Sequence, residues 1–160
     1  MPASRLIAGK VSRWETPFCD ALLPSVLPFS LTRENAELVV VVSPNGVGRY
    51  PAYEVEFESA PCMKLTHEMN APPRPGWVEA GGFEVQSCAY KWENSPFLEH
   101  SGRVGSFAIF EDAELPMQHF VLAGGDWVVD VLSTQEPKIT EHWSPFTVAQ
   151  RIDEVGKSVT

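Results

Sequence analysis

A strict alternation of apolar and acidic residues at positions 53–58 constrains the fold more than any other feature of this sequence. The six residues read Tyr-Glu-Val-Glu-Phe-Glu, so every second side chain is apolar and every other one is a carboxylate. Side chains of a β-strand alternate between its two faces, so this period of two predicts a half-buried strand. The apolar residues, which we expect on the core side, are Tyr53, Val55 and Phe57.

A first hairpin pattern precedes and includes this strand. The Val-rich run 38–43, which is typical of a strand covered on both faces, and the run 47–58 flank Asn45-Gly46. Asn-Gly is a strong hairpin signal because both residues tolerate positive φ. Pro51 lies within the second run and predicts a sheet edge or a bulge, because proline donates no backbone hydrogen bond.

A second hairpin pattern lies at residues 118–132. Two apolar runs flank Gly124-Gly125, and a turn formed by these two glycines sets which residues face each other. A three-residue turn would instead shift the pairing by one residue and separate the polar pair. For the two-glycine turn, the expected opposite pairs are His119 with Asp130, Phe120 with Val129, and Leu122 with Trp127.

The remaining elements complete a mainly β (α+β) expectation. Further strands are predicted near residues 83–90, 106–112 and 138–143. Ser144-Pro145 supplies a helix N-cap and a first-turn proline, which predicts a C-terminal helix at about 145–155. We therefore expect one domain over residues 1–160, with an antiparallel sheet of about eight strands that forms either a barrel or a sandwich.

Proline and ambiguous composition interrupt this pattern in three places. Residues 20–27 are expected to be irregular because Pro24 and Pro28 interrupt them, and residues 71–76 form a Pro-rich loop. Residues 32–38 fit either one helical turn or the bend of a hairpin.

Charge and composition exclude several classes of function. The 160-residue chain has a formal net charge of −9, whereas nucleic-acid binding needs clustered basic residues. No apolar run reaches the roughly 20 residues that span a bilayer, and the N-terminus lacks a signal-peptide core. We therefore expect a cytoplasmic protein with no nucleic-acid or membrane partner. The sequence identifies no cofactor and leaves the oligomeric state open.

Histidine and cysteine provide the candidate chemistry. His119 opposite Asp130 would form a dyad suited to general base catalysis, but the same pair also fits an ordinary contact on a solvated sheet face. Cys62 lies five residues before His67, which is of interest only if the chain folds back between them. The three cysteines are expected to be unpaired and buried. The four histidines lack metal-ligand spacing, so we predict no metal site.

Acidic residues indicate a surface for a cationic partner. Glu54, Glu56 and Glu58 share one strand face at steps of about 6.6–6.8 Å, so that face should be solvated or should contact a basic surface. Residues 104–137 contain six acids and no Lys or Arg, whereas residues 1–14 contain three basic residues and no acid.

Three functional hypotheses follow. The favoured one is a non-catalytic, acidic interaction domain that engages a basic protein partner through Glu54, Glu56 and Glu58. The second is a β-barrel that binds a small apolar ligand in a cavity lined by aromatic residues such as Trp127, one of five tryptophans. The third is a hydrolase or isomerase that uses His119 and Asp130.

Overall fold

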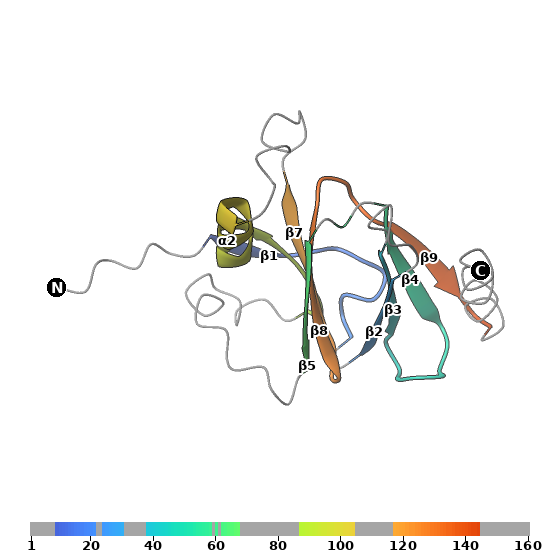
Figure 1. Ribbon diagram of the computed structural model, residues 1–160. Coiled ribbons are helices and arrows are strands. Elements are labelled where there is room, and N and C mark those ends of the chain that lie inside the picture. The colour runs from blue at the N-terminus through green and yellow to red at the C-terminus, as the bar shows by residue number, and fades with distance from the viewer. Residues whose placement is uncertain are drawn as a thin grey trace, which may run out of the picture.

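Two antiparallel β-sheets face each other across a shared apolar core (Figure 1). The computed structural model describes residues 9–21, 24–30, 38–58, 60, 62–67, 87–104 and 117–144. The strands of the five-stranded sheet, in spatial order, are β1 (Lys10–Arg13), β6 (Ala89–Glu93), β7 (Gln118–Ala123), β8 (Trp127–Ser133) and β5 (Cys62–His67). Those of the four-stranded sheet are β2 (Ser25–Ser30), β3 (Leu38–Ser43), β4 (Ala52–Phe57) and β9 (Lys138–His142).

The alternating run of apolar and acidic residues at positions 53–58 supplies part of this core. Tyr53, Val55 and Phe57 are buried between the sheets, as predicted. The Phe57 ring meets the Phe120 ring of β7 edge-on, with centroids 5.5 Å apart. Strand β3 is buried along its whole length, which confirms the prediction of a strand covered on both faces.

The two sheets form a sandwich, so the expectation of a closed barrel is not met. The edge strands of the five-stranded sheet are β1 and β5, and those of the other sheet are β2 and β9. The described residues contain nine strands. No helix among these residues has the length and apolar character needed to cross a membrane.

The first hairpin forms with a longer loop than predicted. Strands β3 and β4 pair antiparallel with Val42 opposite Tyr53, but β4 begins at Ala52. Gly46 has a φ of +105°, which glycine adopts without steric cost, and its amide donates to the Ser43 carbonyl. The prediction of an edge position or bulge at Pro51 is wrong, because Pro51 precedes β4 and β4 lies between β3 and β9.

The second hairpin forms with its register shifted by two residues. His119 faces Leu132 and Asp130 faces Val121, so the predicted opposite pairing of His119 with Asp130 is wrong. The Gly124 amide donates to the Trp127 carbonyl at 2.8 Å, which leaves Gly125 and Asp126 as the turn residues. The partners predicted for Phe120 and Leu122 are also wrong. Phe120 faces Val131 instead of Val129, and Leu122 faces Val129 instead of Trp127.

Contacts with β2 explain this position of the turn. The Asp126 carboxylate accepts hydrogen bonds from Ser25 Oγ and from the Val26 amide, both at 2.9 Å. The Gly125 amide donates to the Pro24 carbonyl at 2.9 Å. These bonds join the β7–β8 turn to the other sheet, which the local hairpin pattern could not reveal.

Other elements differ from the sequence predictions or lie outside the described residues. Residues 25–27 of the segment predicted to be irregular belong to strand β2, and Pro28 is accommodated because β2 is an edge strand. Strands β1 and β5 and helix α2 (Pro96–Val104) were not predicted. Predictions that fall outside the described residues are the strand at 106–112, the loop at 71–76, the C-terminal helix at about 145–155, most of the segment 32–38, and residues 83–86 of the strand near 83–90.

Candidate functional site

A buried hydrogen-bonded chain joins Ser95, His119 and Asp130. The distance between His119 Nε2 and Asp130 Oδ1 is 2.8 Å, and that between His119 Nδ1 and Ser95 Oγ is 2.6 Å. The exposed fractions are 0% for Ser95 and 2% for each of the other two residues. The predicted association of His119 with Asp130 therefore occurs, and it has a third member that the sequence reasoning did not identify.

The strand register explains why the two residues meet. His119 and Asp130 are diagonal neighbours on β7 and β8, and diagonal side chains on one face remain within reach of each other. Phe120 packs into the core between the sheets, so its neighbour His119 lies on the outer face of the five-stranded sheet.

One neutral tautomer of the His119 imidazole satisfies both of its hydrogen bonds. A carboxylate only accepts hydrogen bonds, so His119 Nε2 carries the hydrogen that it donates to Asp130. In the neutral ring Nδ1 is then an acceptor, and the Ser95 hydroxyl donates to it. Ser95 Oγ also accepts a hydrogen bond from the Leu98 amide at 3.1 Å.

Ser95 occupies the N-cap of α2, two residues after the end of strand β6. The Leu98 amide bonds to its side chain, and the Glu99 amide donates to its carbonyl at 3.0 Å, as an N-cap requires. The preceding residue, Asn94, has a φ of +52° and turns the chain from the strand into the helix. The dipeptide Ser95-Pro96 is the signal that could have revealed this helix start, because proline favours the first helical position.

Two aromatic rings orient His119. The Trp92 ring is stacked on the imidazole, with centroids 5.6 Å apart and an interplanar angle of 12°. The Phe97 ring of α2 approaches at 5.3 Å and 66°. Because these contacts supplement the two hydrogen bonds, the imidazole orientation is determined by packing as well as by polar partners.

A cavity of about 380 Å³ lies beside this chain, and His119 forms part of its wall. Residues near the ends of β1, β6 and β7 and the first turn of α2 contribute to it. Its apolar wall comes from Trp92, Leu98 and Met117, and its charged residues are Lys91 and Glu93. The Lys91 ammonium also forms an ion pair with Glu136 and lies 5.5 Å from the Phe120 ring centroid.

The predicted acidic row does not form one solvated face. Glu54 is only 2% exposed, and its Oε1 atom lies 2.6 Å from His142 Nε2 on the neighbouring strand β9. Glu56 is half-buried and Glu58 is exposed. The expectation of a solvated row is therefore wrong for Glu54, because β9 pairs with β4 and brings a histidine to that carboxylate.

Three other residues singled out from the sequence, Trp127, Cys62 and His67, are not in the cavity lining. Trp127 is half-buried and faces His67 of β5, with ring centroids 4.9 Å apart and an interplanar angle of 84°. Cys62 and His67 are the two ends of the same strand, β5. At about 3.3 Å per residue they are roughly 17 Å apart, and an odd separation places them on opposite faces. The structure thus contradicts a joint Cys62–His67 site.

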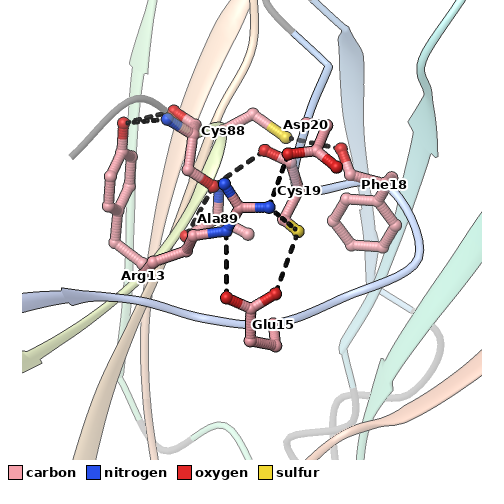
Figure 2. A network of polar contacts seen from close by, with 9 residues as sticks. Arg13, Glu15, Phe18, Cys19, Asp20, Cys88 and Ala89 are labelled. Carbon is pink, nitrogen blue, oxygen red and sulfur yellow. Dashed lines mark hydrogen bonds and ion pairs between the residues drawn. The ribbon is translucent and has the colours of Figure 1, made fainter.

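A second polar network surrounds Arg13 at the end of β1 (Figure 2). Its guanidinium contacts Cys19 Sγ at 3.0 Å, Glu15 Oε1 at 3.1 Å, and the Asp20 carboxylate. The Asp20 hydrogen bond is the main cause of a raised Arg13 pKa. The predicted basic N-terminal segment therefore contains one arginine whose charge is locally compensated.

The three cysteines of the chain form no disulfide bonds. Cys19 and Cys88 are buried, as expected, whereas Cys62 is only half-buried. Burial raises the pKa of Cys88 from its ordinary value of 9.0 to about 12, and its thiol donates to the Phe18 carbonyl at 3.2 Å. A thiol that remains protonated is a poor nucleophile, so Cys88 has a packing role.

The described residues contain no group of three or more His, Cys, Asp or Glu side chains placed to hold a metal ion. No protein-family model, curated protein or solved structure matches this chain. Because a fold does not determine a function by itself, the function is inferred from the site residues and their geometry.

Proposed function

We propose that this chain binds a small organic ligand in the cavity beside α2. The observation that supports the proposal is a cavity of about 380 Å³ in which apolar and charged side chains converge. Ligand sites typically measure about 300–1,000 Å³ and combine an apolar wall with a few polar groups. The core between the sheets is filled by residues such as Phe57 and Phe120, so this ligand site differs from the barrel interior expected from the sequence.

The cavity lining favours a ligand with an apolar body and one anionic or hydrogen-bonding group. Trp92, Leu98 and Met117 offer apolar surface to the body of such a molecule. Lys91 and Glu93 give the lining one charge of each sign, and Glu136, the ion-pair partner of Lys91, is 55% exposed in its side chain. Exposed ion pairs contribute only about 0–1 kcal/mol, so an anionic ligand group can compete with Glu136 at little cost.

The test is a thermal-shift screen of small aromatic and aliphatic carboxylates, amides and esters, followed by calorimetric titration. A ligand present at about 100 times its Kd should stabilise the folded protein by about 2.7 kcal/mol. Leu98→Trp fills the cavity wall and should abolish binding. Val47→Trp, at a loop residue that is 70% exposed, is the matched control and should bind normally.

Two results would contradict the proposal. One is the absence of any stabilising compound in a screen with folded protein. The other is binding that Leu98→Trp and Val47→Trp affect equally, because such binding would lie outside the cavity.

The acidic interaction function is a separate proposal. It rests on the net charge of −9 and on Glu56 and Glu58, since Glu54 is buried. Affinity capture on immobilised basic peptides at low and high salt tests it. Charge reversal by Glu56→Lys with Glu58→Lys should remove any salt-sensitive binding, and binding that survives the reversal would exclude this surface.

A further inference from the structure

We propose that Ser95 is a nucleophile for the hydrolysis of small carboxylic esters, with His119 as its general base. The inference rests on the proposed function, because the ester would occupy the cavity beside α2. It extends the dyad expected from the sequence by one residue, and that residue changes the chemistry that is available.

The third residue determines which reaction the site can perform. Asp130 and Ser95 occupy the two ring nitrogens of His119, at 2.8 and 2.6 Å. A substrate proton therefore has no vacant nitrogen on the imidazole, which argues against an isomerase in which His119 alone abstracts a proton. The Ser95 hydroxyl is the group through which the histidine can act, as in the general arrangement of nucleophile, base and orienting carboxylate.

The helix contributes to the proposed chemistry. Ser95 lies at the N-terminus of α2, which has nine residues. Pro96 has no amide hydrogen, and the Leu98 and Glu99 amides donate to Ser95 itself, so the contribution of the helix is the positive end of its dipole, which stabilises negative charge that develops at this position. An oxyanion formed on a substrate bonded to Ser95 would lie next to this end of the helix.

Access of a substrate to Ser95 requires a movement of the first turn of α2. In the structure Ser95 is 0% exposed, and its Oγ atom accepts the Leu98 amide hydrogen. Two neighbours of Ser95 line the cavity. Asn94 precedes it in the chain, and Leu98 donates its amide hydrogen to Ser95 Oγ. An opening of this single turn would expose Oγ to a molecule already in the cavity, so we expect acylation to be slow and limited by this opening.

The reaction balances without a further co-reactant. Ser95 Oγ attacks the ester carbonyl carbon while its proton moves to His119 Nδ1. The carbon–alkoxy bond then breaks, and the Nδ1 proton leaves with the alcohol. Water attacks the resulting acyl-serine, gives one proton to Nδ1 and forms the free acid, and Ser95 Oγ recovers that proton. Asp130 stabilises the transient imidazolium through the Nε2 hydrogen bond.

The experiment is incubation of the full chain with an alkyl fluorophosphonate, followed by intact-mass measurement and peptide mapping. We expect one adduct, located on Ser95. Ser95→Ala should abolish it, and Ser95→Asn, which retains a good helix N-cap, should do the same. Ser133→Ala is the matched control, because Ser133 in strand β8 is as buried as Ser95. This substitution should leave the labelling rate unchanged.

His119→Gln separates the catalytic role from a structural one. It should slow labelling at least about a hundredfold, which is the lower range of general-base contributions. Circular dichroism and a thermal midpoint verify that each variant is folded. Absence of an adduct on the folded wild type, or an adduct that persists in Ser95→Asn, would overturn the inference and leave the Ser95–His119–Asp130 chain with a structural role.

The two proposals fail in different ways. Cavity binding that Leu98→Trp abolishes, without any Ser95 adduct, supports the ligand-binding function and refutes the nucleophile. A Ser95 adduct without any reversible ligand in the screen supports the nucleophile and refutes equilibrium binding. Absence of both refutes both.

Discussion

Replacement of His119 by Phe should cost this protein a large part of its folding stability. The ring can still contact Trp92 and Phe97, but both polar contacts of the imidazole are lost. Asp130, at 2% exposure, loses a hydrogen-bond donor at 2.8 Å, and the loss of a donor by a buried carboxylate costs about 3 kcal/mol or more. The buried Ser95 hydroxyl loses its acceptor, which costs about 1–3 kcal/mol more.

The expected loss of unfolding free energy is therefore at least about 4 kcal/mol, compared with about 5–15 kcal/mol for a typical domain. Equilibrium urea denaturation of the wild type and the variant measures it. An unchanged m-value with a lower midpoint would identify a change in stability alone.

A second substitution tests the cause of this loss. Asp130→Asn removes the buried charge but keeps the side-chain shape, so His119→Phe with Asp130→Asn should recover at least about 2 kcal/mol relative to His119→Phe. The matched control combines His119→Phe with Glu54→Gln in the other sheet, where the two losses should simply add. The explanation by a buried charge fails if His119→Phe costs less than about 1 kcal/mol, or if Asp130→Asn gives no recovery.

Three further predictions concern other buried or constrained residues. Gly9→Ala should cost at least about 1–3 kcal/mol in urea denaturation, because Gly9 has a φ of +76° and a Cβ atom would lie 1.8 Å from the Glu93 carbonyl oxygen; a neutral result would contradict this backbone geometry. Asp126→Ala removes the carboxylate that accepts hydrogen bonds from the Val26 amide and from Ser25 Oγ. It should lower the urea midpoint by the equivalent of about 1.5–3 kcal/mol. An unchanged midpoint would show that these hydrogen bonds do not contribute to stability. Burial raises the pKa of Cys88 to about 12, so the folded state retains its proton more strongly, and unfolding free energy should fall as pH rises from about 9 toward 12 by up to about 1.4 kcal/mol per pH unit. Cys88→Ala should reduce this slope, and an identical slope would refute the assignment.

The sequence predicted those parts of the fold that depend on local periodicity. The core side of residues 53–57 and the burial of β3 followed from side-chain alternation, which depends only on strand geometry. Strand β2 was not predicted, because Pro28 argues against a strand wherever its place in the sheet is unknown. The burial of Glu54 beside His142 was also inaccessible, because β4 and β9 are far apart in the chain. A run of carboxylates does not show which strand will lie beside it.

The predicted contact between His119 and Asp130 survived an incorrect register for a specific reason. The observed pairing differs from the predicted one by two residues, and a shift of two keeps every side chain on its original face. The pair changes from opposite to diagonal, and the long imidazole still reaches the carboxylate at 2.8 Å. A shift of one residue would have separated them. The face of a hairpin on which its polar residues lie is therefore more predictable than the residues opposite which they pair.

Ser95 could not be assigned to the same site from local sequence, although its dipeptide indicates a helix start. Residues 96–104 include Gly102 and Ser101 in the helix interior, and both residue types lower helix propensity. A short helix of this composition depends on tertiary contacts, here the Ser95 hydroxyl and the Phe97 ring against His119. The histidine therefore helps to dock the helix, and the helix delivers the serine to the histidine. Neither element could be placed from its own sequence alone. The effect of a substitution at His119 must therefore be measured on both folding stability and Ser95 labelling.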